Sequence, residues 1–71
     1  MSFDYSKLRG RMREKDKTFC DLASEVGISS STFSQKINNH AEFKQCEIAS
    51  ICKALDIAPQ AVNEYFFVIK V

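Results

Sequence analysis

A single glycine, Gly27, separates two short amphipathic segments in the middle of the chain. Before it, apolar residues recur at the spacing of one helical face, at Phe19, Leu22, Ala23 and Val26. Thr18 can cap this helix, and Asp21 stands three residues later, where an acidic side chain completes a capping box. Because glycine adopts the left-handed conformation without steric cost, the pattern predicts a helix over about 18–26 that ends in a sharp turn.

A second helix is expected directly after this turn. Ser29 can cap it, and Phe33 and Ile37 give it one apolar face. Two asparagines at 38–39 end it, and its outer face is short, polar and nearly uncharged. Two short helices that meet at a tight glycine turn, the second with a polar face, are typical of the helix-turn-helix, which places its second helix in the major groove of DNA. We assign this arrangement to about 18–38.

An N-terminal helix is predicted by Leu8 and Met12, which repeat at a spacing of four residues. It begins at residue 4 or 6 and ends near residue 15. Gly10 lies inside it, at a cost of about 1 kcal/mol relative to alanine. Such a glycine is usually tolerated where another backbone must approach closely, so a close approach is expected at Gly10.

The C-terminal half predicts two more helices and a short extended segment. Residues 45–55 place their apolar side chains on one stripe, and Pro59 suits the first position of a fifth, short helix. The last six residues, 66–71, are mostly β-branched and aromatic and read as a strand, which needs a partner edge because six residues are not stable alone.

The length of 71 residues allows one hydrophobic core, and no linker or repeat divides the chain. We therefore expect a single all-α domain over 1–71, with five helices and a short C-terminal β segment. No apolar run approaches the roughly 20 residues that span a bilayer, and the N-terminus lacks the order of a signal peptide. A cytoplasmic protein without a membrane partner is expected.

The sequence holds no constellation typical of a metal site or an active site. Cys20, Cys46 and Cys52 lack CxxC spacing, and His40 is the one histidine. No disulfide framework, metal or cofactor is therefore expected, and packing is the simplest role for the thiols, with Cys20 placed near the core. Without paired carboxylates at useful spacing or a glycine-rich phosphate loop, we do not expect an enzyme.

The outer face of the helix after Gly27 carries side chains that can read DNA bases. Glutamine presents a donor and an acceptor together and pairs bidentately with adenine, and serine hydroxyls donate or accept. Base contacts are expected from Ser29, Ser30, Ser31, Ser34 and Gln35. For Ser29 and Ser30, a role as helix cap or solvated surface is the alternative.

Contacts to phosphate would orient this helix on DNA without reading sequence. They are expected from polar or basic residues beside the two helices, namely Lys17, Thr18, Lys36, Asn38, Asn39, His40 and Lys44. For each lysine, a solvated surface charge is an equal alternative. Because the net charge is only +1, a few phosphate contacts per subunit predict a modest dependence of binding on salt.

A dimer would present two such helices one DNA turn apart, roughly 34 Å. The C-terminal tail offers apolar surface and a strand edge for this purpose, with contacts from Phe66, Phe67, Val68, Ile69 and Val71. In the alternative, the tail folds back on Phe3 and the first helix of its own chain. Both arrangements are compatible if residues 1–3 add a strand.

The segment 18–38 also resembles the helix-turn-helix of phage repressors and Cro proteins. Four stretches resemble a family of small Cro-like phage regulators: Tyr5-Ser6-Lys7-Leu8, Gly27-Ile28-Ser29, Thr32-Phe33-Ser34 and Glu64-Tyr65-Phe66-Phe67. The resemblance implies a five-helix, repressor-like DNA-binding domain that acts as a homodimer on a palindromic operator in a lysis–lysogeny switch, within a bacterial host. Family members often carry a DNA-contacting glutamine at the first residue of the second helix, whereas this chain has Phe19 there.

Some members of that neighbourhood instead modulate a partner repressor, and the charge distribution also suits this second function. Residues 1–17 hold six basic and three acidic side chains, for a net charge of +3, while the rest hold four basic and six acidic, for −2. A modulator or antirepressor would bind its partner repressor through the basic first helix or the apolar tail. Charge reversal at Arg9, Arg11 and Arg13 would then matter more than changes on the serine and glutamine face.

Overall fold

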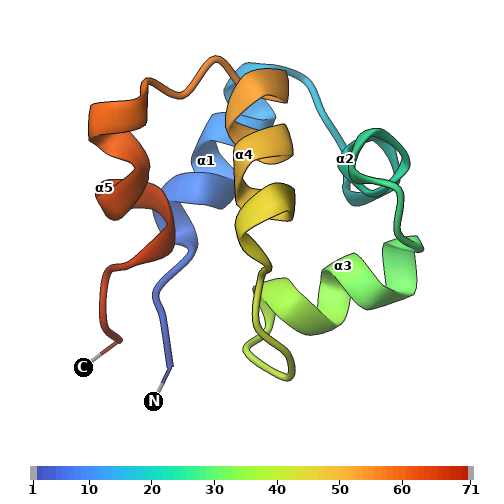
Figure 1. Cartoon of the computed structure of the whole chain (residues 1–71), viewed down its shortest axis with the longest axis horizontal. Helices are drawn as coiled ribbons and strands as arrows, with labels where there is room; N and C mark the ends of the chain where they lie inside the picture. The colour runs from blue at the N-terminus through green and yellow to red at the C-terminus, as the bar shows by residue number, and fades with distance from the viewer. Residues whose placement is uncertain (1, 71) are drawn as a thin grey trace.

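The computed structural model describes residues 2–70, and these are mostly helical (Figure 1). In chain order the elements are α1 (Ser6–Glu14), α2 (Phe19–Val26), α3 (Ser30–Ile37), α4 (Gln45–Ala54), the 3-10 turn η1 (Pro59–Ala61) and α5 (Val62–Phe66). The prediction of an all-α fold with five helices is therefore confirmed. The fifth helix differs in one detail, because its first turn at Pro59 is the separate 3-10 turn η1.

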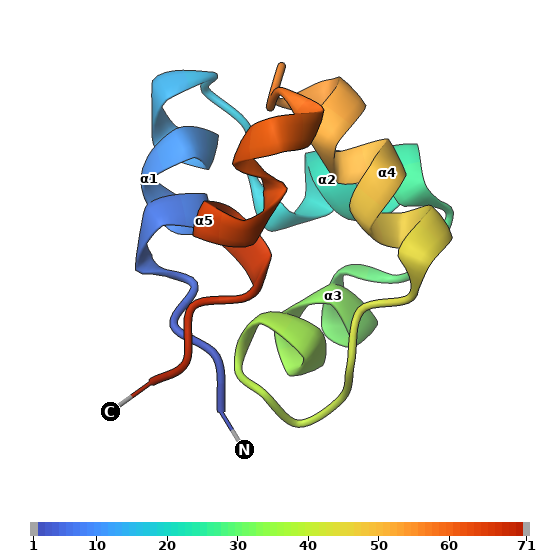
Figure 2. The same ribbon diagram turned by 60° about the vertical axis from the view of Figure 1, so that its left-hand side comes forward.

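In the view of Figure 1, helix α4 lies in the middle, with α1 and α5 to one side and α2 and α3 to the other. Figure 2, turned by 60°, shows α4 in front of α2 and α3 below them. Each helix contributes a buried side chain to one common core, through Leu8, Leu22, Phe33, Ile51 and Phe66. Phe43, in the loop before α4, packs edge-on against the rings of Tyr5, Phe33 and Phe66, with centroids 5.5–5.8 Å apart. These aromatic contacts fix the loop after α3 to the core.

The two helix starts and the turn between them follow the local signals in the sequence. Thr18 Oγ1 accepts the Asp21 N–H at 3.2 Å, and the Asp21 carboxylate accepts the Thr18 N–H at 2.9 Å, so the predicted capping box is confirmed. Gly27 closes α2 in the left-handed conformation, with φ 91°. Ser29 Oγ accepts the Thr32 N–H at 3.1 Å and caps α3.

The explanation offered for Gly10 is wrong. A Cβ placed at Gly10 meets no atom within 4 Å beyond its own helix backbone and chain neighbours, so no other backbone approaches it. A Cβ at Gly27 also has open space, but the positive φ of that residue strains any other side chain. Substitution by alanine is therefore expected to change the stability in opposite directions at the two glycines.

We expect Gly10→Ala to raise the free energy of unfolding by about 0.5–1 kcal/mol, because alanine lowers the entropy of the unfolded chain. We expect Gly27→Ala to lower it by about 1–2 kcal/mol, the cost of a left-handed alanine. Urea unfolding followed by circular dichroism measures both changes. Destabilisation by Gly10→Ala would show that this site has a packing role.

The C-terminal tail departs from the prediction of a strand over 66–71. Helix α5 continues through Phe66, and only a short antiparallel pairing follows, a bridge between Phe3 and Ile69. The Asp4 N–H donates to the Val68 carbonyl at 2.7 Å, and the Lys70 N–H donates to the Ser2 carbonyl at 2.9 Å. The two chain ends thus run side by side (Figures 1 and 2), as the fold-back alternative predicts.

Candidate nucleic-acid interface

Helix α3 follows α2 after a turn of three residues, 27–29, and lies at one edge of the molecule (Figures 1 and 2). Its inner face packs on α2, where the rings of Phe33 and Phe19 have centroids 5.3 Å apart. Phe33 and Ile37 are buried. One face of α3 is therefore held by the core, and the opposite face is open.

The open face carries the predicted base-reading side chains. Ser30, Ser31 and Gln35 are exposed, and Ser34 is half-buried. At 100° per residue, Ser31 and Gln35 project opposite the buried residues of the same helix. The structure thus brings these four side chains onto one uncharged polar surface, which we call the α3 outer face.

Ser29 serves as the cap of α3, one of the two roles expected of it, and the cap does not exclude a base contact. Its hydroxyl accepts the Thr32 N–H and donates its proton to Thr32 Oγ1 at 2.8 Å. Because the proton is already donated, only acceptor capacity remains at Ser29.

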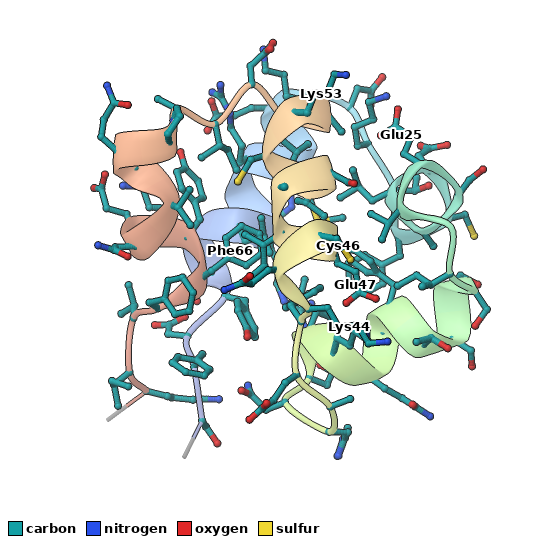
Figure 3. All side chains as sticks on the ribbon, in the orientation of Figure 1. Glu25, Lys44, Cys46, Glu47, Lys53 and Phe66 are labelled. Atoms are coloured by element: carbon teal, nitrogen blue, oxygen red, sulfur yellow. The ribbon has the colours of Figure 1, made fainter. Side chains whose placement is uncertain are left out.

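The predicted phosphate contact of Lys36 is wrong. Lys36 is buried, and its Nζ donates to Glu47 Oε1 of α4 at 2.5 Å. The same oxygen of Glu47 accepts the Lys44 N–H at 2.8 Å, at the start of α4 above α3 (Figure 3). Burial alone would raise the pKa of Glu47, but the hydrogen bonds from Lys36 and the Lys44 amide, with both nearby charges, hold that pKa below its ordinary value.

The predicted phosphate contact of Asn39 is also corrected. Its side-chain oxygen accepts the Phe3 N–H at 2.8 Å, and its Nδ2 donates to the Phe3 carbonyl at 3.0 Å. The amide of Asn39 thus acts as a strand partner for the N-terminal segment. Asn39 itself adopts a left-handed φ of 66°, which asparagine tolerates better than most residues.

The other predicted phosphate contacts differ in availability. His40 is exposed in the loop after α3, and Lys44 is exposed at the start of α4. Asn38 is also exposed, but its side chain already bonds Arg9 and Ser34. Thr18 is exposed, but its hydroxyl caps α2, and Lys17 pairs with Glu25 at 3.2 Å. Of the predicted phosphate contacts, the structure therefore leaves His40 and Lys44 as the more available ones.

The three arginines of α1, treated as one set in the sequence, have different surroundings. Arg11 donates from Nε to the Leu55 carbonyl at 2.9 Å and from Nη2 to the Asp56 carbonyl at 3.0 Å, so it completes the end of α4. Arg9 instead donates to the Asn38 side chain at the end of α3, at 3.0 Å. Arg13 is exposed. Arg9 and Arg13 are four residues apart, a spacing that places both on one face of α1. Sequence reasoning did not assign this face to nucleic acid.

The predicted dimer contacts also divide into two groups. Phe66 is buried, so its assignment to a dimer interface is wrong, and in Figure 3 it points from α5 toward α4. Phe67, Val68 and Ile69 are 49%, 42% and 49% exposed. Beside them lies a groove of about 400 Å³, lined in part by aromatic rings of Phe3, Tyr5, Phe43, Phe66 and Phe67. Val71 lies outside the described residues.

The cysteines only partly follow the packing expectation. Cys52 is buried, which raises the pKa of its thiol, whereas Cys20 and Cys46 are exposed, so the placement of Cys20 near the core is wrong. Within residues 2–70, no group of three His, Cys, Asp or Glu side chains is arranged to hold a metal ion. In the same range, every helix is too short or too polar to cross a membrane.

Comparison with known sequences places the chain in a family. A family model described as "Protein of unknown function (DUF739)" matches residues 1–68, nearly the whole sequence. None of the curated proteins compared with the chain matches it. The protein is therefore a member of the DUF739 family.

Proposed function

We propose that the protein is a sequence-specific DNA-binding transcription regulator of the Cro-like repressor type, and that it reads a palindromic operator through the major groove as a homodimer. The observation that carries this proposal is the α3 outer face, where exposed serine hydroxyls and one glutamine amide stand opposite the buried face of the helix. These groups match the donors and acceptors of base edges. By the resemblance, the operator would belong to a phage lysis–lysogeny switch in the cytoplasm of a bacterial host.

The arrangement around α3 supports this reading. A tight turn with a left-handed glycine joins α2 and α3, as in a helix-turn-helix, and α3 lies at an edge that a DNA groove can reach. The cation of Lys36 is turned inward, so the outer face itself carries no charge. Binding would therefore depend on hydrogen bonds at the bases and a few phosphate contacts, which predicts a modest salt dependence.

The exposed tail residues Phe67, Val68 and Ile69 support a dimer, because adjacent exposed apolar side chains beside an unpaired strand edge form a patch that a second chain can cover. The tail pairs with Ser2–Asp4 of its own chain through one edge, and this pairing leaves the other edge for a partner. A two-fold axis near the tail would make both subunits contribute the same patch.

The same apolar patch supports a second candidate function, that of a modulator or antirepressor. Beside it lies the aromatic groove of about 400 Å³, which is large enough to receive side chains of a partner repressor. Arg9 and Arg13 would contribute to binding such a partner. Arg11 would not, because its guanidinium already donates to carbonyl groups at the end of α4.

Selection from a pool of random duplexes, followed by sequencing, tests the two functions against each other. Sedimentation equilibrium gives the mass of the same protein sample. We expect enrichment of an inverted repeat with half-sites about one helical turn apart, and the mass of a dimer. A monomer that enriches no sequence would contradict operator binding and favour the modulator.

Gln35→Ala is expected to weaken binding to the enriched operator by about 1–3 kcal/mol, because the variant loses one bidentate base contact. Binding to random duplex should stay within about twofold, since the substitution removes no charge. Gln60→Ala is the matched control, because Gln60 is also an exposed glutamine but lies in η1, outside the helix-turn-helix segment. Equal discrimination by wild type and Gln35→Ala would remove Gln35 from the reading surface.

A further inference from the structure

Arg9 differs from most of the basic residues on and near α1. Lys7 pairs with Glu64, Arg11 with Glu14, Lys15 with Asp56 and Lys17 with Glu25, at 2.8–3.4 Å. Within the described residues, Arg9 and Arg13 are the members of this group without a carboxylate partner. The charge of Arg9 is therefore not neutralised by the fold.

The guanidinium of Arg9 is nevertheless held in place by neutral contacts from two other helices. Its central carbon lies 5.7 Å from the centroid of the Phe19 ring at the start of α2, in a cation–π arrangement. Its Nη2 donates to Asn38 Oδ1 at the end of α3, at 3.0 Å. The ring and one hydrogen bond hold the guanidinium at this place, and among the described residues its other donors have no partner.

This position continues the α3 outer face. The Asn38 side chain that accepts from Arg9 also donates from Nδ2 to Ser34 Oγ at 3.4 Å, so Arg9, Asn38 and Ser34 form one polar line. On its other side, Arg9 borders a hollow of about 200 Å³ whose lining contains no acidic residue: Arg9, Met12, Arg13, Lys17, Thr18 and Phe19. Three cationic side chains thus border a hollow beside the surface that would face DNA, and two of them, Arg9 and Arg13, have no carboxylate partner among the described residues.

We propose that Arg9 is a phosphate-positioning residue, which clamps a phosphodiester of the DNA backbone beside the C-terminal end of α3 while its guanidinium is held over the Phe19 ring. This inference rests on the proposed function and adds to it the contact that sets the register of α3 on the duplex. A planar guanidinium with free donors fits two phosphate oxygens at once. Through Asn38 and Ser34, Arg9 adjoins a surface of hydroxyl and amide groups that match base edges, which is why we favour DNA over an acidic protein partner.

The test measures binding of the full chain to the selected operator and to random duplex across a range of salt concentrations. For Arg9→Ala, we expect both dissociation constants to rise by a similar factor, about tenfold or more, because a phosphate contact carries no sequence information. The slope of log K against log salt should decrease by about 0.9 for each subunit. Arg9→Lys should restore the slope but only part of the affinity, since lysine keeps the charge and loses the planar fork.

Lys53→Ala is the control for charge removal. Lys53 is exposed at the end of α4 far from α3 (Figure 3), so its loss should leave the slope within error of wild type. Thermal unfolding of each variant checks the fold. The proposal is overturned, and the role of Arg9 is structural, if Arg9→Ala weakens binding but keeps the wild-type salt dependence and Arg9→Lys does not restore the affinity.

Two other outcomes separate this inference from the function on which it rests. If the wild type selects an operator and Arg9→Ala binds both duplexes as the wild type does, the inference is overturned and the operator-binding function stands. If the wild type binds neither a selected sequence nor random duplex, both are overturned. A partner repressor bound by the wild type but not by Arg9→Ala would then identify Arg9 as a protein contact.

Discussion

Glu47→Ala is expected to lower the free energy of unfolding by about 3–5 kcal/mol, a large part of the stability of a domain this small. The substitution leaves the buried ammonium of Lys36 without its carboxylate and removes the acceptor of the Lys44 N–H. Lys36→Met should lower the free energy of unfolding by less, because Glu47 still accepts the Lys44 N–H and still lies in the first turn of α4. Urea unfolding followed by circular dichroism measures each change.

The double variant Lys36→Met/Glu47→Met is the matched control for this pair. Replacing both charges with apolar side chains of similar length should recover most of the stability, because neither is then buried without its partner. The coupling free energy between the two sites then follows from the cycle of single and double variants. Additive losses of less than about 1 kcal/mol at each site would contradict a buried, coupled ion pair.

The pair also predicts a dependence of stability on pH. The pKa of Glu47 is lower in the folded protein than its ordinary value of 4.5, so its ionisation contributes stability that is fully present above that ordinary value. That contribution is lost as the pH falls through the lower folded pKa. The double variant lacks the group, so between about pH 5 and pH 2 its stability should decline less steeply than that of the wild type.

Phe66→Ala and Phe67→Ala should separate the core from the proposed dimer surface. Phe66 is buried, with its ring 5.5 Å from that of Phe43, and its truncation is expected to cost about 3–5 kcal/mol of folding stability. Phe67 is 49% exposed and meets the Phe3 ring edge-on at 6.1 Å, so its truncation should cost less than about 1 kcal/mol. Chemical unfolding at a protein concentration that keeps the chain monomeric compares the two.

Truncation of Phe67 should weaken self-association strongly, although it has little effect on folding stability. If the exposed tail forms the dimer, Phe67→Ala should raise the dimer dissociation constant by about thirtyfold, as expected for loss of an aromatic residue central to an interface. Sedimentation equilibrium over a concentration series measures this change, and Lys53→Ala serves as a distant surface control. A dimer that is unaffected by Phe67→Ala would place the interface elsewhere on the protein.

The local patterns of the sequence determined the helices of this protein. The Thr18 and Asp21 capping box, the left-handed Gly27 and the Ser29 cap each act within a few residues, so their geometry depends little on the rest of the fold. The spacing of apolar residues likewise identified which side of α3 is buried, and hence which side is open. These features could be predicted because the interactions that produce them connect neighbours in the chain.

The tertiary structure alone decided which polar residues are available for binding. Lys36 resembles a surface charge until α4 supplies Glu47, 11 residues away, and the Asn39 amide is taken by Phe3, 36 residues away. Arg11 likewise donates to a carbonyl 44 residues further along the chain, whereas Arg9 donates to Asn38 at the end of α3. A polar side chain is buried or left free according to partners on other helices, and no local pattern encodes those partners.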